Sequence, residues 1–457
     1  MLPVGKMLII GASDAGISAA LRIRELAPEA EVTVVAKDAY PNFSICGLPF
    51  YLSGEVPDWR DLAHRTANEI TEQGIRLLLD HEATAVDPAA KQVSVCAAGG
   101  GISRIGYDRL LIATGAESIK PPIEGLDAPG VFFLRWMADS FAIKRFMDQK
   151  QPKRAVIIGG GYIGLEMADA LTRRQIAVTL VEFAPEVLST LDPDLGQLIR
   201  AELESGGVRV ITGKAVQRIS QNGSELRVHT DTGETEAADM VIAAAGARPA
   251  ADLAQIAGIS TGAANAIFVD RTMATQTIGI WAAGDCAQTW HRILKRHVYL
   301  PLGTTAHKQG RVAGENMIGG KCEFQGSLGT QAVKVFDRVA ASTGLKDKDA
   351  AEAGFDPLTV PLVTPDHKAY YPGAKQLHIR ITGDRSSGRL LGAQMVGHSN
   401  SEVSKRIDIF AAALYHEIGV HELCHLDLSY TPPLSSPWDP VQMAAMDWCA
   451  KNRNKGK

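Results

Sequence analysis

Residues 154–182, RAVIIGGGYIGLEMADALTRRQIAVTLVE, read as a strand, a glycine loop, a helix and a second strand. Gly159, Gly161 and Gly164 fill all three places of the pattern G-x-G-x-x-G. The first glycine allows a tight turn, the second lets the backbone approach a pyrophosphate, and the third lets the helix pack closely on the strand. The amino end of the helix also favours negative charge. The stretch therefore predicts a βαβ unit that binds a dinucleotide.

An acidic residue, Glu182, ends the second strand of this unit. A carboxylate at that place can accept hydrogen bonds from both ribose hydroxyls, and it repels a 2′-phosphate. We therefore expect the unit to prefer NADH over NADPH. A glycine-rich turn without any ligand is disfavoured, because the strand, the helix and the acid all fit the dinucleotide pattern.

A second copy of the pattern lies near the N-terminus, in residues 7–36. Its three glycine places hold Gly11, Ser13 and Gly16, with serine in the middle one. Ala36 stands where a ribose-binding acid is expected, and Lys37 follows it as a candidate cofactor contact. Taken alone, this loop is a weaker indication of a nucleotide site than residues 154–182.

Two further strands end in residues that suit a cofactor. YDRLLIATGA runs into Thr114 and Gly115, and IGIWAAGDCA runs into Gly284 and Asp285. A strand of small residues that ends in Gly-Asp can bring backbone and one carboxylate to a sugar or ribitol chain. Together with two βαβ units about 150 residues apart, these strands predict two nucleotide-binding domains.

From residue 323 onward the pattern changes. Alternating segments predict half-buried antiparallel strands, and residues 402–418 predict an amphipathic helix. We therefore expect an α/β protein with two Rossmann-like nucleotide-binding domains and a C-terminal α+β domain. The expected boundaries are residues 1–120 with 249–322 for the first, discontinuous domain, 121–248 for the second and 323–457 for the third.

The composition is that of an ordinary globular protein, with 46% apolar residues, 21% charged residues and a net charge of −4. The sequence contains no run of about 18 apolar residues, so it predicts no transmembrane helix. The charge gives no general attraction to nucleic acid or to an anionic membrane, so neither is an expected partner. Six cysteines at irregular spacing, without C-x-x-C, fit a cytoplasmic protein with reduced thiols.

The segment PNFSICGLPF, residues 41–50, holds a lone cysteine. No other cysteine precedes Cys96, so Cys46 has no neighbour with which to form a C-x-x-x-x-C pair. Because glycine, proline and an apolar run follow, Cys46 is expected at or just before the start of a helix. Free amides and the helix dipole there lower a thiol pKa. The residue is either a structural core cysteine or a nucleophile beside a cofactor.

The order of these signals resembles the flavin-dependent pyridine nucleotide–disulfide oxidoreductases. Loop, thiol, Thr-Gly, second loop, Gly-Asp and α+β tail follow one another as in that family, over essentially the whole chain. The lone thiol is similar to the single-cysteine branch, which contains coenzyme A-disulfide reductase, NADH oxidase and NADH peroxidase. Three tail segments carry the same resemblance: YYPGA (370–374), SKRIDIFAAAL (404–414) and YTPPLSSPWDPVQMAA (430–445).

The resemblance implies a homodimeric enzyme with FAD and NADH as cofactors. The FAD contacts that it implies are Gly11, Ser13, Gly16, Thr114, Gly115, Gly284 and Asp285. The NAD(P)H contacts that it implies are Gly159, Gly161, Gly164 and Glu182, with Tyr162 as a gate between nicotinamide and flavin. The C-terminal domain would form the dimer interface and bring Tyr370 and Tyr430 toward the thiol of the partner chain.

With one cysteine, Cys46 must bond to a group outside the protein, either as a mixed disulfide or as a sulfenic acid. The resemblance helps to choose, because its peroxide- and oxygen-reducing members carry a histidine where this chain has Asp14. A carboxylate cannot act as a cation there, so a disulfide, a polysulfide or a thiol-bound metalloid is the favoured acceptor. An NADH oxidase or peroxidase, and a flavin-bearing redox or metalloid sensor, are the alternatives.

Tyr430 is the candidate acid for the leaving thiolate, and Tyr370 would position it. Both fit packed interface aromatics equally well. Arg22 and Arg60 could contact the phosphates of coenzyme A, and Asn42 and Ser44 flank the thiol as further candidate substrate contacts. The arginines fit solvated surface charges equally well, so the identity of the disulfide stays open.

One motif indicates a different kind of site, a zinc site. HELCH, residues 421–425, matches the H-E-x-x-H of zinc proteases. It falls in a short helical stretch, so we predict a surface helix and no metal site. His416, His421, His425 and Cys449 receive no predicted role.

Overall fold

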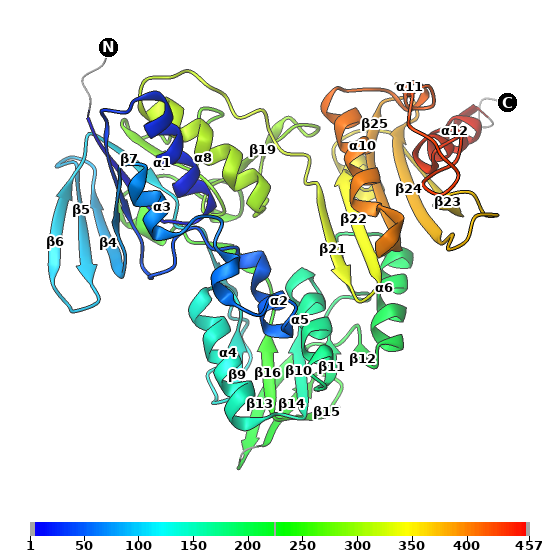
Figure 1. Ribbon diagram of the computed structural model, residues 1–457, viewed down its shortest axis with the longest axis horizontal. Helices are drawn as coiled ribbons and strands as arrows, with labels where there is room; N and C mark the ends of the chain where they lie inside the picture. The colour runs from blue at the N-terminus through cyan, green and yellow to red at the C-terminus, as the bar shows by residue number, and fades with distance from the viewer. Residues whose placement is uncertain (1–4, 224, 454–457) are drawn as a thin grey trace. The chain divides into compact units, whose positions relative to one another are not determined.

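The structure, a computed structural model, describes residues 5–223 and 225–453. The chain divides into two compact units, whose elements are labelled in Figure 1. The first comprises Met1–Ile119, Arg135–Phe141 and Gly246–Ser327, and the second comprises Lys120–Leu134, Ala142–Ala245 and Leu328–Lys457. Within the described ranges, every helix is too short or too polar to span a bilayer.

The first unit is built on a five-stranded sheet of order β18-β7-β1-β2-β3, in which all neighbours are parallel. Its strands are β1 (Lys6–Ile10), β2 (Glu31–Val35), β3 (Ile75–Leu78), β7 (Arg109–Ile112) and β18 (Ile280–Ala282). They are short, apolar and almost fully buried, as expected of strands covered on both faces. The chain runs from β1 through α1 to β2 on one side and returns later to place β7 on the other side of β1. The strand order therefore reverses at β1, which places a topological switch point at its carboxyl end.

Helices α1 (Asp14–Leu26) and α8 (Gly303–Met317) lie side by side in this unit (Figure 1). A Cβ atom on Gly310 would lie 2.1 Å from the Ala15 carbonyl oxygen, and one on Gly314 would lie 2.5 Å from the Ala19 carbonyl oxygen. Only glycine permits this close approach. The contact fixes the amino end of α1 at the carboxyl end of β1.

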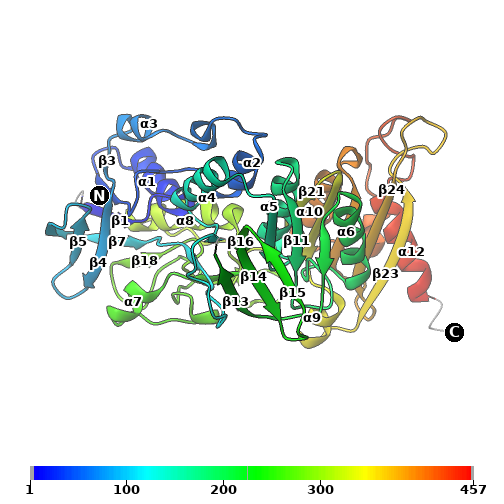
Figure 2. The same ribbon diagram turned by 90° about the horizontal axis from the view of Figure 1, so that it is seen from below.

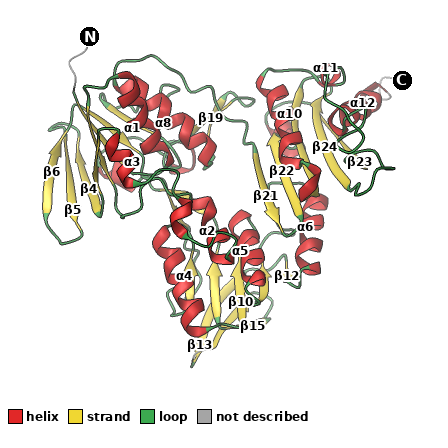
Figure 3. Cartoon of the chain, viewed as in Figure 1, coloured by secondary structure: helices red, strands yellow, loops and turns green. Residues whose placement is uncertain are grey.

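The other elements of the first unit are short. The helices are α2 (Leu48–Ser53), α3 (Ala67–Glu72) and α7 (Asp252–Ile256), with the 3₁₀ turns η1 (Ile45–Gly47), η2 (Trp59–Leu62) and η3 (Ala263–Asn265). An antiparallel sheet contains β4 (His81–Asp87), β5 (Gln92–Ala97) and β6 (Ile102–Gly106), which Figure 3 shows as one three-stranded layer. Two antiparallel pairs join β8 (Ala116–Ser118) to β17 (Ala247–Pro249) and β19 (Thr289–His291) to β20 (Arg296–Val298).

The second unit begins with another parallel sheet, of order β12-β11-β10-β16-β9. Its strands are β9 (Val131–Phe133), β10 (Arg154–Ile158), β11 (Ala177–Val181), β12 (Arg209–Ile211) and β16 (Met240–Ala243). An antiparallel layer of β13 (Val216–Asn222), β14 (Glu225–Thr230) and β15 (Thr235–Ala238) accompanies it. The helices are α4 (Met137–Lys150), which contains residues of both units, α5 (Tyr162–Arg173) and α6 (Pro193–Ser205).

The C-terminal part of the second unit is a five-stranded antiparallel sheet of order β21-β22-β25-β24-β23. Its strands are β21 (Gln331–Val335), β22 (Arg338–Gly344), β23 (Pro357–Pro365), β24 (Gln376–Asp384) and β25 (Leu390–His398). The helices of this part are α9 (Asp347–Glu352), α10 (Val403–Tyr415), α11 (Val420–Leu423) and α12 (Pro440–Arg453), and it also contains the turn η4 (Ser399–Ser401). Helix α10 packs on β22 and β25, and Figure 2 shows α12 beside β23 and β24.

The expected fold class is confirmed: two parallel sheets with glycine loops, followed by an α+β domain. The expected helix over 402–418 is α10, which ends at Tyr415. Cys46 lies in η1 directly before α2, as its sequence context predicts.

Candidate active site

The loop between β1 and α1 has the close packing that its glycines indicate. Gly11 has a φ of 110°, and a Cβ atom on it would lie 2.0 Å from the Ala113 carbonyl oxygen. A Cβ atom on Gly16 would lie 1.9 Å from the Gly11 carbonyl oxygen. Ser13 is the N-cap of α1, and its hydroxyl makes no capping bond, so it stays available to a ligand. This cradle could hold a pyrophosphate against the amino end of α1.

The ends of β7 and β18 adjoin this loop in the same sheet. The Thr114 hydroxyl donates to the Ala250 carbonyl oxygen at 2.6 Å, and Gly115 and Gly284 both have positive φ. Asp285 forms an ion pair with Arg135, with an Nη2–Oδ2 distance of 2.7 Å. The structure thus brings the residues that the sequence assigned to FAD to one edge of one sheet.

Two groups at this edge escaped the sequence analysis. Arg135 Nε and the Tyr299 hydroxyl are buried, and neither has a hydrogen-bond partner. Burial first, and then the Asp285 carboxylate, raise the pKa of Tyr299. Buried donors without acceptors are costly in a folded chain, so they fit a polar cofactor in the cradle. Lys37 follows β2, whose Val35 carbonyl oxygen accepts from the Gly11 amide at 2.8 Å, and its exposed side chain pairs with Glu82 at 2.7 Å.

The second glycine loop, between β10 and α5, repeats the same geometry. A Cβ atom on Gly159 would lie 2.4 Å from the Ala244 carbonyl oxygen, and one on Gly164 would lie 1.9 Å from the Gly159 carbonyl oxygen. Gly161, the middle glycine, faces open space, with no heavy atom within 4 Å of a built Cβ. The Glu182 carboxylate accepts hydrogen bonds from the backbone amides of Gly160 and Ala184. This loop could hold a dinucleotide in the way that its sequence predicts.

Tyr162 is the first residue of α5, and burial raises the pKa of its hydroxyl to about 12. Its hydroxyl lies 3.3 Å from Thr190 Oγ1. Four residues further along the same helix is Glu166, which the sequence analysis missed. Burial raises the pKa of Glu166 to about 7. The sequence could have indicated Glu166, because it lies one helical turn from Tyr162 and therefore on the same face of the helix.

The Glu166 carboxyl gives a testable dependence of stability on pH. Because its pKa in the folded chain lies above the usual 4.5, the folded state loses stability as the pH rises through about 7. Glu166→Gln is therefore expected to flatten the thermal-unfolding profile between about pH 5 and pH 8 and to stabilise the protein above that range by up to about 3 kcal/mol. Differential scanning calorimetry across that range measures the effect. Glu204→Gln, at an exposed carboxylate on α6, should leave the profile unchanged, and an unchanged Glu166→Gln profile would contradict the assignment.

The segment that carries Cys46 is held against the first glycine loop. Asn42 is buried, its backbone has a φ of 57°, and its amide donates to the Ala12 carbonyl oxygen at 2.7 Å. The Ser44 amide donates to the Leu62 carbonyl oxygen at 2.8 Å. The Cys46 thiol is exposed and forms no disulfide. These contacts favour a nucleophile beside the cofactor loop over a core cysteine.

An aromatic cluster that the sequence analysis missed supports the same segment. Tyr40, Phe43, Trp59 and Phe141 contact one another with ring centroids 5.3–5.9 Å apart. Such pairs stabilise beyond the area that they bury. The cluster fixes both ends of the turn that precedes the thiol.

Asp14, the first residue of α1, has histidine neighbours that the sequence did not indicate. Its Oδ1 lies 3.4 Å from Nε2 of His307, and His64 is the next neighbour. Burial raises the pKa of Asp14, and the two histidines oppose that shift. The sequence argument that this position lacks a cation is therefore incomplete, because long-range contacts supply two imidazoles.

The two candidate substrate arginines are already paired. Arg22 contacts Glu315 and, at 2.8 Å, Glu25. Arg60 pairs with Asp58 at 3.1 Å. A cavity of about 620 Å³ instead collects other cations of the same unit. Its lining includes Ser18, Arg65, Gln73, His307, Lys308 and Arg311.

Tyr370 and Tyr430 are both exposed on the C-terminal part of the second unit. Desolvation, and then the neighbouring hydroxyl of Tyr370, raise the pKa of Tyr430. The structure therefore places the two tyrosines in contact. A phenol that keeps its proton can act as an acid.

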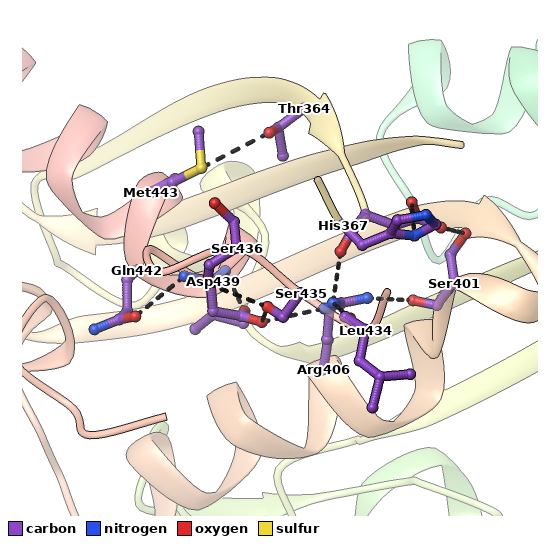
Figure 4. Close-up of polar contacts among 12 residues, drawn as sticks. Thr364, His367, Ser401, Arg406, Leu434, Ser435, Ser436, Asp439, Gln442 and Met443 are labelled. Carbon is purple, nitrogen blue, oxygen red and sulfur yellow. Dashed lines mark hydrogen bonds and ion pairs between the residues drawn. The ribbon is translucent and has the colours of Figure 1, made fainter. Parts of the chain in front are cut away.

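The loops that carry these tyrosines are tied to one buried cation, Arg406 on α10 (Figure 4). Arg406 Nη1 donates to the Ser401 carbonyl oxygen at 2.6 Å. Its Nη2 donates to the carbonyl oxygens of Asp366 and Leu434, at 2.8 and 3.1 Å. Asp439 lies 3.5 Å from Nε and provides the countercharge. One guanidinium thus joins four segments of the domain.

The first three residues of the HELCH segment lie in the short helix α11, and the rings of His421 and His425 lie 5.0 Å apart. Cys424 lies beside Cys449, and burial and then this contact raise the pKa of Cys424 to about 11. In the described part of the chain, no group of three metal-ligating side chains includes His421 or His425.

Comparison with known proteins agrees with this geometry. Residues 5–310 match the family described as pyridine nucleotide-disulphide oxidoreductase, and residues 330–440 match the dimerisation domain of that family. The NADH oxidase of Methanocaldococcus jannaschii is 33% identical, over 98% of this chain and 100% of its own. The CoA-dependent NAD(P)H sulfur oxidoreductase of Pyrococcus abyssi is 34% identical, over 96% of this chain and 97% of its own.

Among solved structures, an NAD-dependent persulfide reductase from A. fulgidus superposes with a TM-score of 0.93 and 37% identity. The match covers 99% of this chain and 84% of that one. The two glycine loops, the antiparallel tail and these likenesses agree. The chain belongs to the pyridine nucleotide–disulphide oxidoreductases, with FAD and NAD(P)H as its cofactors.

Proposed function

We propose that this chain is a homodimeric, NADH-dependent reductase that acts on a persulfide or disulfide of a phosphate-bearing thiol, of which coenzyme A is the model. The observation that carries the proposal is the exposed thiol of Cys46, held at the first glycine loop by the Asn42 amide. A thiol that is exposed and lies in the turn before a helix is accessible to an incoming sulfur and is stabilised as a thiolate.

The cavity described above supports a phosphate-bearing substrate. Arg65 and Lys308 give it two cations, whereas Arg311 pairs at 3.2 Å with Glu25, the acidic residue of the lining. Arg65 follows His64, whose amide donates to the Asn42 carbonyl oxygen at 2.9 Å, so the cavity adjoins the segment that holds the thiol. Relatives named for coenzyme A, from Pyrococcus abyssi and Pyrococcus horikoshii, favour the same class of substrate.

In the proposed reaction, the Cys46 thiolate attacks a carbon-bound sulfur of the substrate and forms a mixed disulfide with the phosphate-bearing thiol. The S–S bond of the substrate breaks, and the leaving thiolate takes a proton from Tyr430, which Tyr370 positions. Because the tail is a dimerisation domain, we assign this tyrosine pair to the second copy of the chain. The Cys46 thiolate would be restored, and the bound thiol released, by an electron pair that NADH passes through FAD when both cofactors are bound.

The cofactor contacts belong to the proposal as well. FAD would be held by Gly11, Ser13, Gly16, Thr114, Gly115, Gly284 and Asp285, in a domain of residues 1–120 and 249–322. NADH would be held by Gly159, Gly161, Gly164 and Glu182, in a domain of residues 121–248, with Tyr162 covering the nicotinamide position until NADH binds. Glu182 favours NADH because it repels a 2′-phosphate.

An NADH oxidase is the second candidate. The relative from Methanocaldococcus jannaschii has that name, and the two histidines beside Asp14 place imidazole rings near the thiol segment. In that case Cys46 would cycle through a sulfenic acid.

Turnover of the FAD-loaded dimer separates the two. We expect NADH consumption under anaerobic conditions with coenzyme A persulfide or disulfide, and little consumption with oxygen alone. Mass spectrometry of the protein purified without reductant should find a coenzyme A adduct on Cys46. Rapid oxygen consumption together with an oxidised, adduct-free Cys46 would support the oxidase instead. Parallel assays with NADPH test the nucleotide preference.

The basic cavity can be tested separately. Lys308→Ala and Arg65→Ala are expected to raise the KM for coenzyme A disulfide by about tenfold each, equivalent to about 1.4 kcal/mol of binding. The KM for cystine, which has no phosphate, should not change. Arg76→Ala, at an exposed arginine outside the cavity lining, is the matched control. An equal effect on both substrates would contradict phosphate recognition in this cavity.

A further inference from the structure

Three side chains from distant parts of the first unit meet at one point. Asp14 begins α1, His64 follows η2, and His307 lies on α8. One carboxylate oxygen of Asp14 and one ring nitrogen of each histidine all lie within 4.8 Å of one another. In the described ranges, these are the only three side chains of the ligating types that gather in this way.

The distances suit a metal ion. His307 Nε2 and Asp14 Oδ1 are 3.4 Å apart. Two ligands of a tetrahedral Zn²⁺ with bonds of about 2.0–2.1 Å are separated by about 3.3 Å. The His64 ring is exposed, and its centroid lies 6.2 Å from that of His307, so a rotation of this side chain completes the set.

The carboxylate oxygen that faces the histidines lacks a donor. Asp14 Oδ1 is buried and has no hydrogen-bond partner. On its other side Asp14 packs on Gly303, where a Cβ atom would lie 3.2 Å from Oδ2. No lysine or arginine lies within ion-pair distance of the carboxylate in the part of the chain that is described. A buried anionic oxygen of this kind favours a bound cation.

The second ring nitrogen of His307 is already oriented. His307 Nδ1 lies 2.9 Å from the Ser18 hydroxyl, one turn along α1 from Asp14. When Nδ1–H donates to that hydroxyl, the Nε2 lone pair points toward Asp14. Histidine ligands of metal ions are held by such a second hydrogen bond, which fixes the ring and its tautomer.

We propose that Asp14, His64 and His307 form a two-histidine, one-carboxylate site for a divalent transition-metal ion, with Zn²⁺ as the best-suited probe. Three protein ligands leave at least one coordination position open. The ion would join α1, α8 and the segment after η2. That segment also holds the Cys46 turn through the Asn42–His64 and Ser44–Leu62 hydrogen bonds. The site is a different one from the HELCH segment.

Equilibrium dialysis of the FAD-loaded full chain against Zn²⁺ tests the proposal. The experiment uses a Cys46→Ser background, since that thiol is itself a zinc ligand. We expect one Zn²⁺ per chain, and Asp14→Asn and His307→Asn should each weaken binding by more than about 100-fold. Ser18→Ala, which keeps all three ligands, should weaken it by about 10-fold. FAD content and circular dichroism show whether each variant is folded.

Co²⁺ in place of Zn²⁺ gives a second measurement, because its visible absorption reports the coordination geometry directly. Tetrahedral or five-coordinate bands that disappear in His307→Asn are expected. His425→Asn is the matched control and should leave both measurements unchanged. Zinc that is lost in His425→Asn, or that is retained in both Asp14→Asn and His307→Asn, would overturn the proposal.

Discussion

Replacement of Cys46 by serine is expected to abolish disulfide and persulfide turnover, by on the order of 10³-fold or more, as for loss of a catalytic nucleophile. A serine hydroxyl is not ionised at neutral pH and cannot form the mixed disulfide. The FAD cradle does not include this side chain, so the variant should retain its flavin. NADH consumption with the disulfide, together with stopped-flow bleaching of the flavin by NADH, measures the two effects separately.

Cys96→Ser is the matched control for this variant. Cys96 lies on β5 and is also reduced, but it is far along the sequence from the turn before α2. It should retain full turnover. Turnover at the wild-type rate in Cys46→Ser would refute the assignment of Cys46 as the nucleophile. Loss of flavin in that variant would show that the cysteine has a structural role.

The second large effect is expected at Arg406. Arg406→Met should destabilise the C-terminal domain by about 3–5 kcal/mol, because it leaves the buried Asp439 carboxylate without its countercharge and three carbonyl groups without a donor. Urea unfolding measures the loss. Hydrogen exchange followed by mass spectrometry should show faster exchange in peptides that cover residues 364–372 and 430–440.

The neighbouring residue provides the control. Lys405 is exposed and pairs with Asp408 at 3.0 Å, and an exposed pair of this kind contributes at most about 1 kcal/mol. Lys405→Met should therefore leave the unfolding curve and the exchange rates nearly unchanged. Similar losses in the two variants would show that the Arg406 network is not what holds the tyrosine loops.

The fold could be predicted because its signals are local. Gly16 and Gly164 each meet the carbonyl oxygen of the first glycine of the same loop, so the sequence pattern alone specifies the turn, whereas the contact of Gly11 with Ala113 comes from the assembled sheet. The helix start after Cys46 was predictable for the same reason, since glycine and proline follow it directly.

The parts of the site that were missed depend on tertiary contacts. His64 and His307 reach Asp14 from far along the chain, as Arg135 reaches Asp285. No spacing rule connects such residues before the sheet is assembled. The same limit explains why the pairing of Arg22 could be predicted only in part. Glu25 lies one turn further along the same helix, whereas Glu315 lies on another helix.

The anchoring of the tyrosine loops has a consequence for how this chain can diversify. At the base of one loop, the Asp366 amide donates to the Lys375 carbonyl oxygen at 2.9 Å and the Lys375 amide donates to Asp366 Oδ1 at 3.0 Å, and Arg406 holds the base of both loops. The tips therefore vary independently of their bases: insertions or exchanges between residues 367 and 374 alter what the loop meets without disturbing the sheet below. Because Tyr370 lies in this tip, such changes would also reach the tyrosine that we assign to position Tyr430, while the Arg406 anchor stays in place.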